Sequence, residues 1–231
     1  MHHRAICSAL NDDELAGLNQ IASHRRLRAG QRIISDQEHV EYFAIIIAGS
    51  VKLEKLLPDG RRQVVGLLLP SDFVGRPFEA RGSYHAEAAT AVQLCSFPAA
   101  RFEQLMQQYP GIGHRLFRHA LSQLDAAQNW MLLLGRKTAQ EKVASLLLMI
   151  AGRLRELGFS EPDGRGGTGC MQLELPLSRS EIADYLGLTI ETVSRQFRIL
   201  KSDGVIKLGG TRNLTILDAS KLEAMATSAI V

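Results

Sequence analysis

The sequence predicts an α+β chain in which a jelly-roll β-barrel is followed by a long helix and a winged helix-turn-helix. Three observations support this fold class. Short alternating apolar runs between residues 27 and 97 are separated by Gly- and Pro-containing turns. An apolar repeat of about 3.5 residues follows Pro110. A capped helix, a glycine corner and a second helix lie between Leu177 and Leu200. We divide the chain into residues 1–108, 109–135 and 136–231.

Bulk composition limits the possible classes of protein. The 231 residues carry a net charge of +3, which is too small to indicate a nucleic-acid partner by itself. Three widely spaced cysteines form no disulfide framework, which indicates a reducing compartment. No apolar stretch reaches the roughly 18 residues of a membrane span, and no apolar core of a signal peptide follows Met1. We expect a cytoplasmic protein with no membrane partner.

The N-terminal part predicts a short helix and then a barrel. Asn11 to Ile21 has acids in its first turn and apolar residues at helical spacing. The runs that follow alternate as strands do, and turn residues such as Pro58-Asp59-Gly60 separate them. The expected strands are Arg32–Ser35, Tyr42–Ala48, Val51–Leu57, Gln63–Leu69 and Ala88–Phe97.

Helical periodicity returns after Pro98. Ala99 to Gln108 predicts a short helix, and Pro110 opens a longer one that reaches about Gly135. Its apolar seam consists of Leu116, Ala120, Gln123, Leu124, Ala127, Trp130, Met131 and Leu134. Such a seam more often packs inside one subunit. Here the helix stands between a barrel and a helix-turn-helix, so we expect a parallel dimerisation helix, with Ala120 and Ala127 allowing close approach.

The third part begins at a hinge. Thr138 can cap a helix whose apolar stripe includes Val143 and Ile150. Asp163 to Gly169 is too rich in glycine for regular structure and predicts a loop. Met171 to Leu175 alternates as a strand.

Two short helices around a tight corner come next. Ser178 and Glu181 form an S-x-x-E capping box at the start of the first helix. Gly187 allows the corner, and Thr189 can cap the second helix, which runs to about Lys201. This arrangement predicts a helix-turn-helix.

The second helix has two chemically different faces. Val193, Phe197 and Leu200 recur at core spacing. Glu191, Ser194, Arg195 and Arg198 lie on the other side of the helix. Arg can clamp guanine and Glu can accept a hydrogen bond from cytosine N4. The alternative is a solvated face with a Glu191–Arg195 ion pair. The capped helix and glycine corner favour base reading.

Behind this helix, Val205 to Leu208 and Asn213 to Leu217 predict a two-stranded wing, and Ser220 to Val231 predicts a short helix. The stretch from Arg195 through Arg212 contains five basic residues and one acid. This local excess of positive charge is suited to contact with DNA phosphates. The candidate DNA-contacting residues are Ser178, Thr189, Glu191, Thr192, Ser194, Arg195, Arg198, Lys201 and Arg212.

The run GLTIETVSRQF resembles the recognition segment of the Crp/Fnr superfamily of transcription regulators, in its Fnr/FixK-like branch. That branch carries the signature E-x-x-S-R, which matches Glu191, Ser194 and Arg195. The cyclic-AMP-responsive branch has Arg before the Glu, where this chain has Ile190. The resemblance implies a cyclic-nucleotide-binding-like barrel, a homodimer, a palindromic TTGAT-type operator, RNA polymerase as a partner and a role as an activator in the oxygen-limitation response.

The resemblance also bears on effectors. Nucleotide-binding members carry G-E-L and, further on, R-S or R-T. Here Arg76 follows Gly75, and His85-Ala86 replaces the later pair. The comparison predicts that cyclic AMP does not bind.

Fnr proteins hold a [4Fe–4S] cluster with three N-terminal cysteines and one barrel cysteine, because the cluster needs four ligands. Cys95 matches the barrel cysteine and Cys7 the last of the three, so two ligands would lie before residue 1. We expect no cofactor in the chain as given. Either a longer form is an oxygen-sensing [4Fe–4S] regulator, or this is a FixK-like protein without a cluster, in which Cys95 is a small core residue.

Two other classes of protein fit the sequence less well. A cupin-like metalloenzyme would need H-x-H in the barrel, and the barrel region has none, so we do not expect an enzyme. A protein-interaction module with a degenerate helix-turn-helix is disfavoured because Glu191 and Arg195 are both present.

Overall fold

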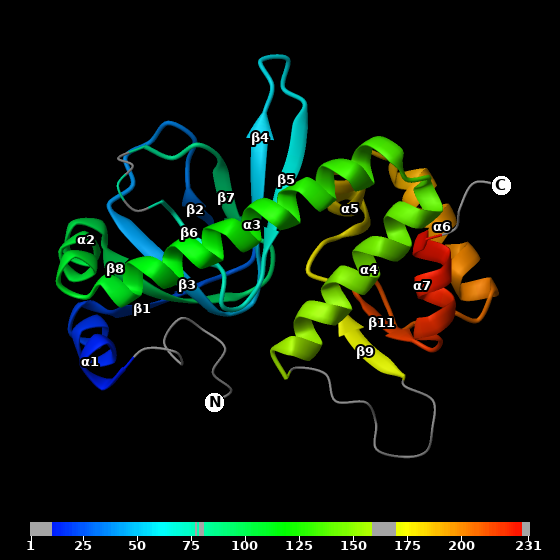
Figure 1. Cartoon of the computed structure of the whole chain (residues 1–231). Helices are drawn as coiled ribbons and strands as arrows, with labels where there is room; N and C mark the ends of the chain where they lie inside the picture. Colours follow the sequence, from blue (N-terminus) through cyan, green and yellow to red (C-terminus); the bar gives the residue numbers. More distant parts are fainter. Residues whose placement is uncertain (1–10, 77, 79–80, 159–169, 228–231) are drawn as a thin grey trace. The chain divides into compact units, whose positions relative to one another are not determined.

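The computed structural model describes residues 11–76, 78, 81–158 and 170–227 (Figure 1). The chain divides into two compact units, Met1–Ala126 and Ala127–Val231, and the boundary falls inside one long helix.

The first unit contains two four-stranded antiparallel sheets, with strand orders β1-β8-β3-β6 and β2-β7-β4-β5. This confirms the predicted jelly-roll barrel. Apolar side chains that alternate along the strands, including Ala44, Ile46 and Val51, form the core between the sheets. The strands are β1 (Ser23–Leu27), β2 (Arg32–Ile34), β3 (Tyr42–Ala48), β4 (Val51–Leu56), β5 (Arg62–Leu68), β6 (Phe73–Val74), β7 (His85–Ala88) and β8 (Val92–Pro98).

Three details of the barrel correct the sequence prediction. β1 was not predicted, because SHRRL shows no alternation; it is an exposed edge strand that pairs only with β8. The short strand β6 was missed as well. The expected single strand Ala88–Phe97 is in fact the end of β7, a turn and then β8.

Helices cover the outer face of the sheet that contains β3 and β8. Helix α1 (Asp12–Ile21) begins with a capping box between Asn11 and Glu14, and α2 (Ala99–Gln108) follows β8 directly. Phe102 of α2 lies 4.7 Å from Phe43 and 5.6 Å from Phe97 between ring centroids. This aromatic cluster also receives Ile112, fully buried at the start of the long helix α3 (Pro110–Arg136).

The second unit is the predicted winged helix-turn-helix. Its helices are α4 (Ala139–Glu156), α5 (Arg179–Leu186), α6 (Ile190–Ser202) and α7 (Ala219–Thr227). Thr138 caps α4 as expected, since its hydroxyl and backbone N–H both bond with Glu141. The expected loop Asp163–Gly169 and the last residues of the expected C-terminal helix, 228–231, lie outside the described residues.

The wing has three strands instead of the predicted two. β10 (Ile206–Leu208) and β11 (Asn213–Ile216) form the expected hairpin, and β9 (Met171–Glu174) pairs with the other edge of β11. The strand before the helix-turn-helix therefore joins the strands behind it. Within the described part of the chain, no helix is long and apolar enough to cross a membrane.

Candidate DNA-binding surface

The corner between α5 and α6 is built by local interactions. The Ser178 backbone N–H donates to Glu181 Oε2 at 2.8 Å, and the Glu181 N–H donates back to Ser178 Oγ at 3.3 Å. Helix α5 ends at Gly187, whose φ of 62° lies in the left-handed region that glycine tolerates best. Thr189 then caps α6 by accepting from the Thr192 N–H at 3.2 Å.

Helix α6 separates an apolar face from a polar one, as the sequence predicts. Val193, Phe197 and Leu200 are at most 1% exposed. Thr192 and Ser194 are partly exposed, and the exposed candidates are Glu191, Arg195, Arg198 and Lys201. Among the described residues no ion pair joins Glu191 to Arg195, so both charged groups remain available to a ligand.

Glu191 is held in its charged form. A backbone N–H at the start of α6 and the Thr189 hydroxyl bond to its carboxylate, and both lower its pKa. An ionised carboxylate only accepts hydrogen bonds, which suits it to a donor such as cytosine N4.

Arg179 packs against α6, a contact that the sequence did not indicate. Its guanidinium carbon lies 3.5 Å from the centroid of the Phe197 ring, a cation–π contact that joins α5 to α6. Burial lowers the pKa of Arg179. The two residues are far apart in sequence, and no local pattern could have paired them.

Arg212, in the wing, contacts α5 and the residues just before it. One guanidinium nitrogen donates to the Pro176 carbonyl at 2.9 Å, and another lies 3.8 Å from Glu181 Oε2. The structure thus shows Arg212 bound to its own chain. Its contact with a DNA phosphate stays a prediction.

The exposed apolar stripe of α3 is displaced from the predicted seam. Three of the predicted residues contact their own subunit instead: Leu116 packs on the aromatic cluster, Gln123 bonds to Asp72, and Trp130 stacks on Tyr185. Ala120, Leu124, Ala127 and Met131 are exposed, and Leu134 is partly buried. The large exposed apolar residues of α3 are Phe117, Leu121, Leu124, Met131 and Leu132.

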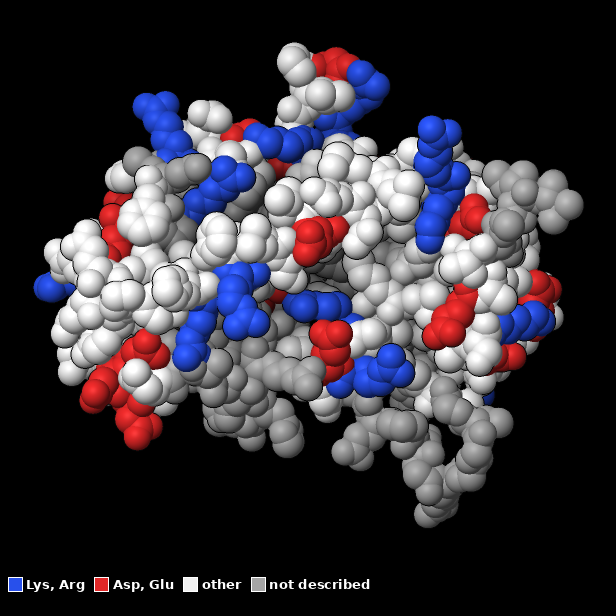
Figure 2. Space-filling view, in the orientation of Figure 1, with Lys and Arg blue, Asp and Glu red and all other residues white. Residues whose placement is uncertain are grey.

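In Figure 2 uncharged side chains cover much of α3, and an acidic patch lies near the middle of the helix. Phe117 and Met131 are each 64% exposed and Leu124 is 52% exposed. We define the outer stripe of α3 as Phe117, Leu121, Leu124 and Met131. All four side chains are exposed in the described structure.

In the described part of the barrel, positions 85 and 86 make local contacts. Ala86 is fully buried in the apolar core, and the neighbouring His85 accepts a hydrogen bond from the Asp36 backbone N–H at 3.2 Å. Arg76 lies 6.0 Å from the centroid of the Tyr84 ring. Positions 85 and 86, where the family's nucleotide binders carry an arginine and a hydroxyl residue, are thus used for local packing and backbone bonding.

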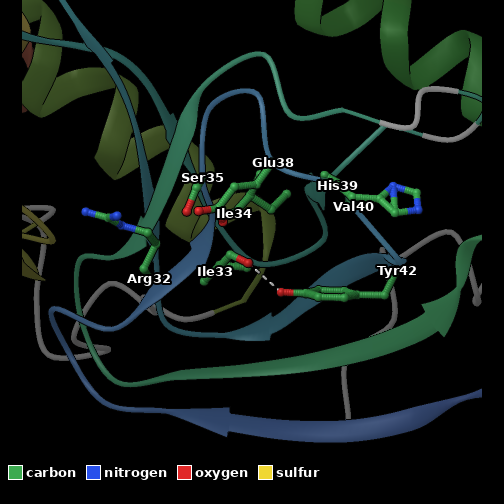
Figure 3. Close-up of a pocket in the computed structure, with 8 residues that line it drawn as sticks. All are labelled: Arg32, Ile33, Ile34, Ser35, Glu38, His39, Val40 and Tyr42. Atoms are coloured by element: carbon green, nitrogen blue, oxygen red, sulfur yellow. Dashed lines mark hydrogen bonds between the residues drawn. The ribbon is translucent and has the colours of Figure 1, made fainter.

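A pocket of about 260 Å³ lies at the strand end before β3 (Figure 3). Tyr42 forms one side, and its hydroxyl donates to the Ile33 carbonyl at 2.6 Å. The Arg32 and His39 side chains point towards opposite ends of the pocket, so they do not converge on one ligand. The lining residues are Arg32, Ile33, Ile34, Ser35, Glu38, His39, Val40 and Tyr42.

The cysteines do not complete an iron–sulfur site. Cys95 is partly buried on β8 and packs beside the apolar cluster of α1 and α2, and Cys7 lies outside the described residues. A [4Fe–4S] cluster needs four thiolates and the sequence contains three cysteines. In the described part of the chain, no group of three or more His, Cys, Asp or Glu side chains is arranged to hold a metal ion.

Two family models match the chain. The Crp-like helix-turn-helix domain matches residues 141–225, and the cyclic nucleotide-binding domain matches residues 24–109.

Known proteins match over nearly the whole chain. "Transcriptional activator protein FnrL" of Cereibacter sphaeroides is 48% identical over 222 residues, covering 96% of this chain and 88% of FnrL. "Nitrogen fixation regulation protein FixK" of Bradyrhizobium diazoefficiens is 38% identical over 226 residues, covering 97% of this chain and 90% of FixK. The solved structure of FixK2 from Bradyrhizobium japonicum has a TM-score of 0.78 and 32% identity, and the match covers 91% of this chain and all of FixK2.

The barrel, the long helix and the capped reading helix together define a DNA-binding transcription regulator, and not an enzyme. The chain belongs to the Crp/Fnr family, in its Fnr/FixK branch.

Proposed function

We propose that this regulator binds a palindromic TTGAT-like operator as a homodimer and activates transcription. The observation that carries the proposal is the exposed edge of α6: Glu191 and Arg195 point outward from a helix whose other face is buried. A helix with capped ends and a packed underside presents such side chains in a fixed geometry.

The roles of the candidate residues follow from their chemistry. Arg195 reads guanine through two hydrogen bonds, Glu191 accepts from cytosine on the opposite strand, and Ser194 lies near thymine. The remaining contacts go to phosphates, from exposed cations and from the helix N-termini. The phosphate-contacting candidates are Ser178, Thr189, Thr192, Arg198, Lys201 and Arg212.

A two-fold operator requires a two-fold protein. The outer stripe of α3 supports pairing with a second copy of the chain, because its residues follow one another at helical spacings of four, three and seven positions and are 45% to 64% exposed. Ala120 and Ala127 lie beside the stripe and are exposed too, so two helices could approach closely there. We replace Leu116, Gln123 and Trp130 of the predicted seam with Phe117 and Leu121.

The names of the relatives support the wider role. FnrL is named a transcriptional activator and FixK a nitrogen fixation regulation protein. We infer that this chain acts on cytoplasmic DNA through RNA polymerase in the response to oxygen limitation. Cyclic AMP is not its effector in this proposal, because His85 and Ala86 stand where the family's nucleotide binders carry an arginine and a hydroxyl residue.

A second proposal concerns a longer form. If two further cysteines precede residue 1, Cys7 and Cys95 would complete the four ligands of a [4Fe–4S] cluster. An anaerobic absorption spectrum tests this on the longer protein, since the cluster absorbs visible light. A colourless protein after anaerobic reconstitution with iron and sulfide would contradict the second proposal and leave the first intact.

Two substitutions test the DNA-reading roles. Arg195→Ala should lose about 1 to 3 kcal/mol of binding at the cognate site and little on a duplex with the paired guanine replaced. Lys201→Ala should weaken binding to both duplexes alike, because a phosphate contact is independent of sequence. Gel shifts at matched salt measure both. An equal loss on the two duplexes for Arg195→Ala would rule out its assigned role.

A further inference from the structure

A buried carboxylate lies where the barrel meets α3. Asp72 is 3% exposed and sits in the turn between β5 and β6. Its Oδ2 accepts from the Leu69 backbone N–H at 2.9 Å, while the Asp72 N–H donates to the Leu69 carbonyl at 3.0 Å. One oxygen of the carboxylate therefore closes the turn, and the other is directed to α3.

Two side chains on successive turns of α3 converge on that second oxygen. Gln123 Nε2 donates to Asp72 Oδ1 at 3.2 Å, and His119 Nε2 lies 3.9 Å from the same atom. The two α3 side chains also approach each other, at 3.4 Å between nitrogens. The His119 ring meets Phe73 edge-on, with ring centroids 4.6 Å apart. Residues four apart share one face of a helix, so this cluster marks the face that lies on the barrel.

The polar cluster restricts the rotation of α3 more sharply than its apolar contacts do. Apolar packing of Leu116 is non-directional, whereas a buried carboxylate is strongly disfavoured unless hydrogen-bond donors satisfy it. A shift of one position turns a helix by about 100°, which would carry both side chains away from Asp72. The rotation of α3 that keeps Gln123 and His119 on the carboxylate is therefore favoured over other rotations of the helix about its axis.

The same rotation decides which face of α3 is exposed. Phe117 and Leu121 each lie two positions from His119, which is about 200° around the axis. They are 64% and 45% exposed, and with Leu124 they begin the outer stripe. The contact with Asp72 on one face of α3 thus sets which residues the opposite face of the helix exposes.

We propose that Asp72 is a positioning residue for subunit pairing: through Gln123 and His119 it fixes the rotation of α3, so that each subunit offers the same outer stripe to a second copy of the chain. This inference rests on the proposed homodimer. It assigns to the barrel a direct influence on how the two subunits meet.

Cysteine cross-linking in the full-length chain measures the rotation. The native cysteines are first removed by Cys7→Ser, Cys95→Ala and Cys170→Ser. A reporter on the outer stripe, Leu124→Cys, is compared with an exposed reporter off the stripe, Ser122→Cys. We expect mild oxidation to cross-link the stripe reporter much faster than the other.

Two variants then test the role of Asp72. Gln123→Glu places a second carboxylate against Asp72, and the repulsion should lower the ratio of the two cross-linking rates by about fivefold or more. Adding Asp72→Asn should restore the ratio, because the new amide can donate to Glu in place of the original pair. Gln123→Leu, which brings no charge, should lower the ratio as well.

The outcomes separate the inference from the proposed function. If the cysteine-free background with either reporter is monomeric and cross-links at neither position, the homodimer fails and this inference with it. If the stripe reporter is favoured but Gln123→Glu and Gln123→Leu leave the ratio unchanged, Asp72 has no positioning role and the homodimer stands. Failure of Asp72→Asn to rescue Gln123→Glu would likewise overturn the assigned contact.

Discussion

Trp130 of α3 stacks on Tyr185 of α5, with ring centroids 3.9 Å apart and ring planes 15° apart. Tyr185 is 5% exposed, and burial raises its pKa. Because α5 is the first helix of the helix-turn-helix, the last turns of α3 form part of the DNA-binding unit. The helix that carries the proposed dimer contact therefore also packs against the first helix of the helix-turn-helix.

Removal of this stack should destabilise the C-terminal unit. Trp130→Ala should lower its free energy of unfolding by about 2 to 3 kcal/mol, since it loses both the partly buried ring and the aromatic contact. Trp130→Phe keeps a ring and should lose less than half as much. Urea unfolding followed by circular dichroism measures both, and an alanine variant as stable as the parent would contradict the structural role.

The cap of α5 should matter in the same unit. Ser178→Ala removes the acceptor for the Glu181 N–H and should cost about 1 kcal/mol of stability. Ser180→Ala is the matched control, because Ser180 is exposed on the same helix and caps nothing. Thermal unfolding of the two variants should separate them. Equal melting temperatures for the two variants would show that the cap does not stabilise the unit.

The capping box of α4 predicts a dependence on pH. The backbone N–H and hydroxyl of Thr138 bond to Glu141 and hold its pKa below the ordinary 4.5. A lowered folded-state pKa stabilises the fold above about pH 4.5, and this contribution is lost as the pH falls through the folded value. Glu141→Gln should thus be less stable than the parent at neutral pH, and the gap should close in acid. A gap in melting temperature that stays constant between neutral pH and about pH 3.5 would argue against it.

The outer stripe of α3 predicts the effect of a charge on self-association. Leu124→Glu should weaken the dimer at least about tenfold, because pairing would bury an uncompensated carboxylate. Ser122→Glu adds the same charge on an exposed position off the stripe and should leave pairing nearly unchanged. Sedimentation equilibrium compares the two variants. Equal dissociation constants would mean that the subunits meet elsewhere.

Local signals in the sequence predicted much of the C-terminal DNA-binding unit. They depend on residues within four positions of one another, and include the caps at Ser178 and Thr138, the corner at Gly187 and the two faces of α6. Such patterns are visible in a single chain, because backbone caps and helical periodicity are short-range properties.

Other features depend on partners distant in the chain. No local pattern indicated that Arg179 would lie on Phe197, or that β9 would pair with β11. The seam predicted on α3 is a related case. A repeat of about 3.5 residues indicates that a helix has an apolar face, but it does not indicate that Gln123 would bond to Asp72, which precedes it by 51 positions.

In the proposed function two chains read one palindrome through α6. A titration of the full chain against three labelled duplexes at one salt concentration tests this: a TTGAT palindrome, a single half-site and a scrambled sequence, with the mass of each complex measured. We expect two chains on the palindrome and an affinity about a thousandfold or more above that for the scrambled duplex. One chain per duplex, with equal affinity for all three, would contradict it.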